Sequence, residues 1–287
     1  MLRGEMDGAS TTALMVAAYR ARATARGDGV CDDPWAAGLA GEDGHDVARR
    51  YDEAFAHMEL WIALRVAFFD ARVRRLTSPR DGSVPIAQVV VLGAGFDTRA
   101  ARLARAGVRF FEVDREETQA VKLARLATLP GYPVASASYV TCDFEHQDFL
   151  DRLAGSGFRA NEPALFLWEG VTPYLTEPAV RATLRRIADG THPGSVVVFD
   201  HLRKRIVSGE VVHAKDQQSR EFVADLGEPL RFGIDYPLPL LFEEGFRRVR
   251  MLTFDEVALD LTGTYERARA FRFQGLAVAS KAAPELL

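Results

Sequence analysis

The sequence predicts an α/β fold in which a mostly parallel β-sheet carries helices on both faces. From about residue 85 to residue 200, short apolar runs alternate with stretches of helical pattern, which is typical of parallel sheets. A glycine turn, Gly93-Ala94-Gly95, follows the first apolar run and precedes a helical stretch. The alternation ends after Asp200, and a strand-like run at 269–280 predicts one antiparallel strand at the end of the sheet.

The first 80 residues are helical in pattern. Ser10 to Thr12 can cap a helix over 13–24, because hydroxyl groups accept hydrogen bonds from the free N–H groups of a first helical turn. Apolar residues recur at helical spacing from 46 to 75, which predicts one or two further helices. We expect residues 1–80 to form a helical lid that precedes the sheet.

The core, residues 85–200, is expected to contain five strands and four helices in alternation. The strands are predicted at 88–92, 109–113, 138–142, 164–168 and 195–200. The helices are predicted at 98–106, 116–128, 147–154 and 177–189. Right-handed crossovers between parallel strands leave few arrangements of these elements.

The chain after the core has a different pattern. Residues 201–234 are polar and mostly helical, and we interpret them as an insertion after the fifth strand. Residues 235–287 are expected to form a helix near 239–244 and a final hairpin of strands. All these segments fit one domain over residues 1–287.

Composition and charge exclude several classes of protein. The apolar runs are far shorter than the roughly 20 residues that span a membrane, so we expect no membrane partner. The N-terminus lacks the pattern of a secretory signal, and Cys31 and Cys142 are too few for a disulfide framework or a zinc site. The net charge is −4 and the nearest approach to a basic stripe is 203–205, so we expect no nucleic-acid partner. A cytoplasmic location follows.

The glycine turn is an incomplete fingerprint of a dinucleotide site. Gly93 and Gly95 match its first two glycines, but Thr98 occupies the third position. Asp97 stands where the next helix starts, and there it would repel a pyrophosphate and attract a cationic group. We predict that Gly93, Ala94, Gly95 and Asp97 bind a cationic nucleoside without phosphate, a description that S-adenosylmethionine fits.

Acidic and aromatic residues follow the next strands, at the edge of the sheet where ligands bind in such folds. Asp114 ends the second strand, where a carboxylate can accept hydrogen bonds from ribose hydroxyls. Asp143 and Phe144 follow the third strand and can meet an adenine amino group and one ring face. Glu169 and Gly170 follow the fourth strand, near the amino acid end of the cofactor.

Four motifs, in this order and at these spacings, resemble the leucine carboxyl methyltransferase-like family of class I S-adenosylmethionine-dependent methyltransferases: LGAGFDTR, FFEVD, TCDF and EGVTPYL. The resemblance runs from about Thr12 to the last strand and includes the segment LRVAFFD. It implies a Rossmann-like fold with a mostly parallel seven-stranded sheet and one antiparallel strand. It also implies a helical N-terminal extension and a helical insertion after the fifth strand.

The resemblance further implies roles for single residues. Arg65, in the segment LRVAFFD, would bind the carboxylate of the cofactor, and an arginine among apolar neighbours needs a partner in any case. The glycine turn, the ribose carboxylate, the adenine-side aspartate and the amino-group glutamate of the family match Gly93 and Gly95, Asp114, Asp143 and Glu169.

The expected reaction is an in-line displacement at the sulfonium methyl group, which needs alignment but no metal. A carboxylate acceptor is ionised at neutral pH and needs no base, whereas a phenol or an alcohol benefits from one. His201, just past the fifth strand, and His213, in the insertion, are candidates for this base. Tyr174 is a candidate for lining the acceptor pocket, so Tyr174 and His201 are the predicted catalytic residues. Four arginines can hold an acidic acceptor: Arg203, Arg205, Arg220 and Arg231.

We therefore expect an O-methyltransferase that methylates a carboxylate or a hydroxyl of a small, natural-product-like metabolite and releases S-adenosylhomocysteine. The insertion and the N-terminal helices would form the lid over this acceptor. Carboxyl methylation of a protein C-terminus and an NAD-dependent oxidoreductase are the alternatives. The incomplete glycine fingerprint, Asp97 and the lack of an obvious Tyr-x-x-x-Lys pair argue against the oxidoreductase. The pattern specifies neither the acceptor nor an oligomeric state.

Overall fold

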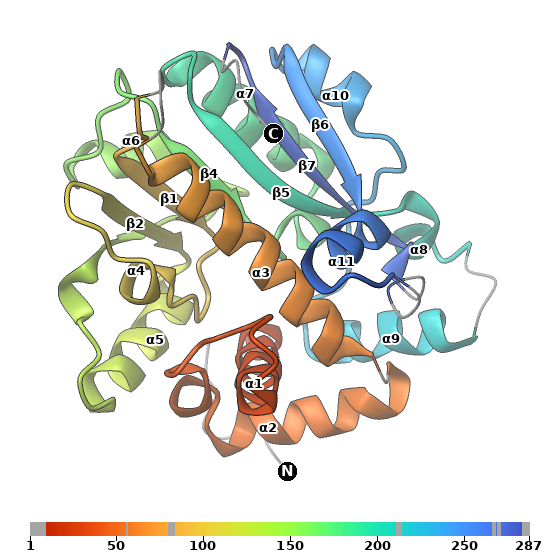
Figure 1. Ribbon diagram of the computed structural model, residues 1–287. Helices are drawn as coiled ribbons and strands as arrows, with labels where there is room; N and C mark the ends of the chain where they lie inside the picture. Colours follow the sequence, from red (N-terminus) through yellow and green to blue (C-terminus); the bar gives the residue numbers. More distant parts are fainter. Residues whose placement is uncertain are drawn as a thin grey trace.

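The structure, a computed structural model, describes residues 10–55, 57–79, 84–210, 214–265, 268 and 271–282. In these ranges a seven-stranded sheet lies between two layers of helices (Figure 1). The strands are β1 (Gln88–Leu92), β2 (Arg109–Asp114), β3 (Ala137–Thr141), β4 (Leu165–Trp168), β5 (Val196–Leu202), β6 (Arg248–Thr253) and β7 (Gln274–Ser280). Their order is β3-β2-β1-β4-β5-β7-β6, and β7 is antiparallel to both of its neighbours. The mostly parallel sheet with one antiparallel strand is confirmed.

Helices precede, connect and follow these strands. They are α1 (Thr11–Arg26), α2 (Ala36–Ala54), α3 (Met58–Thr77), α4 (Arg99–Arg102), α5 (Glu116–Thr128), α6 (Phe149–Ala154), α7 (Glu177–Gly190), α8 (Lys204–Ser208), α9 (Ala214–Asp225), α10 (Leu238–Glu243) and α11 (Phe254–Thr262). The predicted cap of the first helix is present, since the Ser10 hydroxyl accepts from the Ala13 N–H at 3.1 Å. None of the helices in the described ranges combines the length and the apolar character needed to cross a bilayer.

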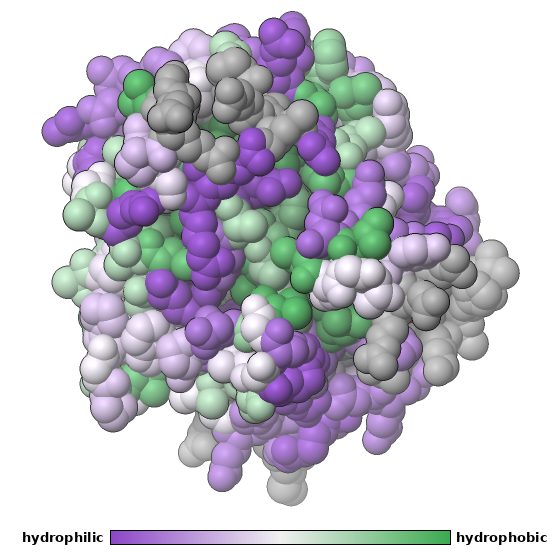
Figure 2. Space-filling view, in the orientation of Figure 1, coloured by the Kyte–Doolittle hydropathy of each residue, from purple (hydrophilic) through white to green (hydrophobic). Residues whose placement is uncertain are grey.

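The two faces of the sheet belong to different hydrophobic clusters, because successive side chains of a strand point to opposite faces. Val89 and Val91 of β1 pack in the cluster that includes residues of α1, α2, α3 and α11. Val90 and Leu92 pack in the cluster that includes residues of α6, α7 and α10. Helix α3 crosses the sheet in Figure 1, and in the same view hydrophobic residues gather toward the middle of the molecule, among hydrophilic ones (Figure 2).

Three elements differ from the sequence prediction. Helix α4 has one turn instead of the expected span 98–106, and its two arginines are held by buried carboxylates. Strand β5 continues to Leu202, so that the insertion begins two residues later than predicted. Helix α11 lies between β6 and β7, where a direct hairpin was expected; a capping box of Thr253 and Glu256 starts it.

Candidate active site

A cavity of about 500 Å³ lies at the carboxyl ends of β1, β2, β4 and β5. Cavities of this size bind small molecules. Residues of α1, α3 and the segment 206–231 also line it, as the expected lid of N-terminal helices and insertion requires. All the predicted site residues except His201 line this one cavity: Arg65, Gly93, Ala94, Gly95, Asp97, Asp114, Asp143, Phe144, Glu169, Gly170 and Tyr174.

The glycine turn is fixed by contacts that only glycine permits. Gly93 has φ 66° and Gly95 has φ 47°, both in the left-handed region. A Cβ atom on Gly93 would lie 2.3 Å from a methyl carbon of Val171, so the turn packs directly on the loop after β4. The Asp114 carboxylate accepts hydrogen bonds from the N–H groups of Gly95 and Arg115. Burial raises the pKa of Asp114, and these two donors oppose that rise.

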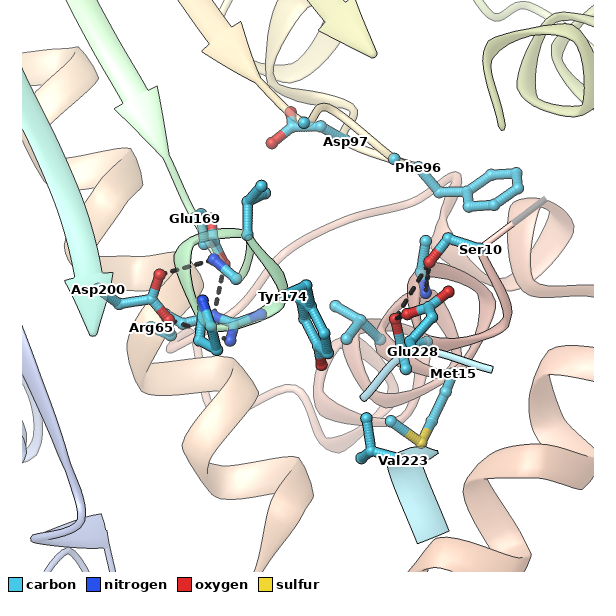
Figure 3. A pocket seen from close by; sticks show the side chains of 18 of the residues that line it. Ser10, Met15, Arg65, Phe96, Asp97, Glu169, Tyr174, Asp200, Val223 and Glu228 are labelled. Atoms are coloured by element: carbon cyan, nitrogen blue, oxygen red, sulfur yellow. Dashed lines mark hydrogen bonds and ion pairs between the residues drawn. The ribbon is translucent and has the colours of Figure 1, made fainter. Parts of the chain in front are cut away.

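Arg65, Glu169 and Asp200 form a buried cluster at one end of the cavity (Figure 3). Arg65 is 5% exposed; its Nε lies 2.9 Å from Glu169 Oε1 and its Nη1 lies 3.4 Å from Asp200 Oδ2. Gly170 has φ 70°, and its N–H donates to Asp200 Oδ1 at 2.6 Å. A Cβ on Gly170 would lie 3.1 Å from Arg65 Nη2, so the absence of a side chain there makes room for the guanidinium.

Arg99 joins three carboxylates below the glycine turn. It is 2% exposed, and its guanidinium contacts Asp70 at 2.6 Å, Asp97 at 2.5 Å and Glu169 at 2.7 Å. Burial raises the pKa of Asp97, but the charges of Arg99, Lys122 and Arg102 and the hydrogen bond from the Arg99 N–H together hold it below its usual value. Asp97 therefore lines the cavity as predicted. Its partner in this structure is the side chain of Arg99 and not a cationic ligand.

A second layer of ion pairs anchors this cluster to the N-terminal helices. Arg102 contacts Asp70 at 2.6 Å, and Arg20 contacts Asp33 at 2.9 Å. The hydroxyl of Thr98, at the position of the missing third glycine, donates to Asp33 at 2.8 Å. The defect in the fingerprint thus has a structural use, because the threonine ties the turn to the segment between α1 and α2.

Asp143 and Phe144 lie at the rim of the cavity, after β3. Asp143 is half-exposed and accepts hydrogen bonds from the Glu145 N–H and from His146 Nδ1, both at 2.9 Å. These bonds lower the pKa of Asp143 although partial burial acts in the opposite direction. The Phe144 ring packs on Phe149 and Trp168.

One wall of the cavity is aromatic and begins at the Arg65 cluster, because the Arg65 guanidinium lies over the Trp61 ring, 5.1 Å from its centroid. Its aromatic residues pack on one another: the ring centroids of Phe55 and Phe273 are 5.7 Å apart, and those of Trp61 and Phe273 are 5.6 Å apart. Tyr174 lies between the Arg65 cluster and Glu228, and Glu228 lies near Ser10 (Figure 3). Burial and, after it, the negative charge of Glu228 raise the pKa of Tyr174 well above its usual value.

The structure does not place His201 at the cavity. His201 follows Asp200 on β5 and therefore faces the opposite side of the sheet, where its ring contacts Phe199. It is 5% exposed, its Nδ1 lies 2.9 Å from the Ile234 carbonyl oxygen, and burial lowers its pKa to about 4. A base role for His201 has no support in this geometry. His213 lies outside the described residues.

The sequence analysis did not single out Arg99, Asp200 or Glu228. Arg99 ends the quoted motif LGAGFDTR, and its place in that motif was the available signal. Asp200 ends an apolar strand at the edge where the other site carboxylates lie, so its position was equally informative. Glu228 has no local signal, because only the fold brings its loop to α1.

The four arginines proposed for an acidic acceptor are not gathered in one place. Arg220 and Arg231 line the cavity, whereas Arg203 and Arg205 do not. Arg231 Nη1 lies 3.6 Å from Glu145. Within the described ranges, no group of three or more His, Cys, Asp or Glu side chains is arranged to hold a metal ion.

The donors and acceptors of the cavity fit S-adenosylmethionine. The neighbouring opposite charges of Arg65 and Glu169 suit the zwitterionic end of an amino acid. The Asp114 carboxylate, at the tip of β2, suits a pair of ribose hydroxyls. The glycine turn between them brings bare backbone to the cavity wall.

Known proteins resemble this chain over most of its length. The sequence model of the leucine carboxyl methyltransferase family matches residues 13–188. A protein of Mycobacterium avium named "Putative S-adenosyl-L-methionine-dependent methyltransferase" is 32% identical over 226 residues, which cover 75% of this chain and 73% of that protein. A protein of the same name from Mycolicibacterium vanbaalenii is 29% identical over 277 residues, or 91% and 86% of the two chains.

Solved structures share the fold. A crystal structure of "a putative methyltransferase" from Thermobifida fusca aligns with a TM-score of 0.65 at 16% identity and covers 98% of both chains. A DUF574 family protein from Streptomyces avermitilis aligns with a TM-score of 0.63 at 14% identity, over 84% of this chain and 91% of that chain. At these identities the likeness shows the fold alone.

Proposed function

The chain belongs to the leucine carboxyl methyltransferase family and is an S-adenosylmethionine-dependent methyltransferase, and we propose that it methylates an oxygen atom, of a carboxylate or a hydroxyl, in a small metabolite. One cavity supports this proposal, because it contains both the residues suited to the cofactor and a wall of apolar side chains that includes Phe55, Trp61 and Phe273. We call the space beside this wall the acceptor chamber. The start of α1 and the loop 227–231 also line the cavity, and its volume of about 500 Å³ suits a small acceptor.

In this proposal the residues of the chain bind and orient the two reactants. Arg65 and Glu169 hold the amino acid end of the cofactor, and Asp114 and Asp143 hold its nucleoside end. When bound, S-adenosylmethionine supplies a methyl group on a positively charged sulfur, which is an activated leaving group. Tyr174 lies between the Arg65 cluster and Glu228 (Figure 3), and the aromatic wall of Phe55, Trp61 and Phe273 helps to exclude water from the reactants.

Calorimetry tests the cofactor. S-adenosylhomocysteine is expected to bind to the purified protein. NAD is expected not to bind, because Thr98, tied to Asp33, takes the place of the third glycine of a dinucleotide site. Binding of NAD without binding of S-adenosylhomocysteine would refute the proposal and favour the oxidoreductase.

Transfer of an isotope-labelled methyl group tests the acceptor. A panel of small carboxylic acids and hydroxyl compounds is compared with peptides that end in a free carboxylate. Transfer to small molecules is expected, whereas transfer to the peptides alone would identify a protein C-terminus as the acceptor. The products are identified by mass spectrometry, which also distinguishes a methyl ester from a methyl ether.

A further inference from the structure

Glu228 is a carboxylate in the wall of the acceptor chamber. It lies in the loop after α9, and its Oε2 accepts a hydrogen bond from the hydroxyl of Thr12 in the first turn of α1 (Figure 3). Its negative charge acts on Tyr174. Burial raises the pKa of the Tyr174 hydroxyl most, and the charge of Glu228 raises it further. Glu228 therefore faces the part of the cavity in which an acceptor would lie.

Glu228 differs from the other carboxylates that line the cavity. Asp97, Glu169, Asp200 and Glu145 each contact an arginine, and Asp114 and Asp143 accept hydrogen bonds from nitrogen donors. In the described part of the chain, the side chain of Glu228 is bound only by a hydroxyl group. A hydroxyl leaves most of the capacity of a carboxylate to accept hydrogen bonds unused.

Most arginines that line the cavity already form ion pairs with carboxylates of the chain. Arg65 contacts Glu169 and Asp200, and Arg231 contacts Glu145. Arg220 donates to the carbonyl oxygen of Val207 at 3.4 Å, with no carboxylate partner among the described residues. A carboxylate acceptor placed beside Glu228 would meet a like charge. Of the arginines that line the cavity in the described part of the chain, only Arg115 and Arg220 have no carboxylate partner that could be shared with it.

The remaining wall of the chamber suits an aromatic body. Phe55, Trp61 and Phe273 pack edge to face, and Tyr51 lies 6.5 Å from Phe55 between ring centroids. Aromatic rings favour such offset and edge contacts with one another. Tyr51, at one end of this wall, and Glu228 both act on Tyr174. A flat apolar acceptor that packs on the wall near Tyr174 would direct its polar group toward Glu228.

We propose, on the basis of the methyltransferase function above, that the acceptor is a neutral aromatic hydroxyl and that Glu228 accepts its proton. The bond between the acceptor oxygen and the methyl carbon forms while the bond between that carbon and sulfur breaks. The bonding electron pair stays on the sulfur, which becomes a neutral thioether. The proton of the hydroxyl passes to the Glu228 carboxylate and from there to water. The products are a methyl ether and S-adenosylhomocysteine.

Binding of two matched probes tests the charge preference without requiring turnover. The fluorescence of 2-naphthol and of 2-naphthoate is titrated with the protein, alone and saturated with S-adenosylhomocysteine. Naphthol is expected to bind tighter, and Glu228→Gln is expected to reduce the ratio of the two dissociation constants. Equal or tighter binding of naphthoate would overturn the proposal, and tighter naphthoate binding that Arg220→Gln abolishes would assign the acceptor carboxylate to Arg220. Failure of both probes to bind would overturn the assignment of an aromatic acceptor to this chamber.

Two variants separate proton transfer from a structural role. Glu228→Gln keeps an acceptor for the Thr12 hydroxyl but removes the proton acceptor, and Thr12→Val removes the hydrogen bond but keeps the carboxylate. With the best aromatic hydroxyl of a panel of hydroxyl and carboxyl pairs, Glu228→Gln is expected to lower kcat about 100-fold or more. Thr12→Val is expected to lower it far less. Equal losses in the two variants, or a panel in which only carboxyl compounds are methylated, would overturn the proposal.

The affinity for S-adenosylhomocysteine distinguishes this inference from the function on which it rests. The wild-type protein and Glu228→Gln are expected to bind it equally, because Glu228 lies beyond Tyr174 from the Arg65 cluster (Figure 3). If the wild-type protein fails to bind it, the methyltransferase function itself fails. If binding is normal and carboxylates are the preferred probes, only the assignment of the acceptor fails.

Discussion

The two ends of the cavity are built in different ways. At the cofactor end, buried arginines and carboxylates neutralise one another, with Arg65 and Arg99 at the centre. At the acceptor end, aromatic and aliphatic side chains dominate, and Glu228 stands among them. The charges of the cofactor end are therefore paired with one another, whereas Glu228, which we propose as part of the acceptor end, is bound only by a hydroxyl group among the described residues. The predictions below test this contrast, from the largest expected effect to the smallest.

Removal of Arg99 is expected to have the largest effect. Arg99→Met leaves three buried carboxylates without their shared cation, and such a loss costs about 3–5 kcal/mol of the free energy of unfolding. Urea unfolding measures it. Arg49→Ala, which breaks an exposed pair with Asp46, is the control and should change stability little. An Arg99→Met variant as stable as the control would show that charge pairing does not hold the cofactor end together.

Acid is expected to lower the free energy of unfolding through His201, which is buried on the face of the sheet opposite the cavity. Burial lowers the pKa of His201 from 6.5 to about 4, so below pH 6.5 the unfolded chain binds a proton that the folded chain resists. Stability from this group is therefore present above pH 6.5 and is lost as the pH falls toward 4, by up to about 3 kcal/mol. Unfolding of wild type and His201→Gln at several pH values measures it, and the variant should lose less on acidification.

The same variant tests the placement of His201 outside the cavity. His201→Gln should bind S-adenosylhomocysteine with the affinity of the wild-type protein, because its ring lies on the face of the sheet opposite Asp200. Loss of ligand affinity without loss of folding would place His201 in the site after all. The exposed His57, whose side chain does not cap helix α3, is changed to Gln as the control for removal of a histidine and should leave the acid sensitivity unchanged.

The cofactor end is expected to control ligand affinity. Arg65→Ala and Glu169→Ala should each weaken binding of S-adenosylhomocysteine by about 1–3 kcal/mol, the range for a hydrogen bond to a charged group. Calorimetry measures both. Unchanged affinity in the two variants would show that the cofactor binds elsewhere in the cavity.

The acceptor end is expected to control the acceptor alone. Phe55→Ala removes one ring of the aromatic wall, which should raise KM for an apolar acceptor by about fivefold, or roughly 1 kcal/mol of lost burial. Affinity for S-adenosylhomocysteine should not change. A parallel loss of both affinities would mean that the two ends of the cavity do not act independently.

The cofactor end could be predicted from the sequence because its residues follow a local rule. Each strand of a parallel sheet ends at the same edge, so Asp114, Asp143 and Glu169 could be assigned to one site from their positions after apolar runs. The glycine turn marked that edge, and the family motifs added Arg65 from a helix. The five core strands and the antiparallel last strand followed from alternation of apolar runs and helical patterns.

The pairing of the buried charges could not be predicted in this way. His201 and Asp200 are neighbours in the chain, but a strand directs neighbours to opposite faces, and only the packing of β5 shows which of them meets Arg65. The role of Arg99 depends on three carboxylates from three separate segments.

The sequence by itself determined the order of strands and helices, the glycine turn and the set of carboxylates at the strand ends, because hydrophobic period and turn chemistry are local properties. Only the tertiary structure decided which charges neutralise one another and which one is left for the acceptor. Glu228 is 216 residues from Thr12 in the chain, and no local pattern records a contact over that separation.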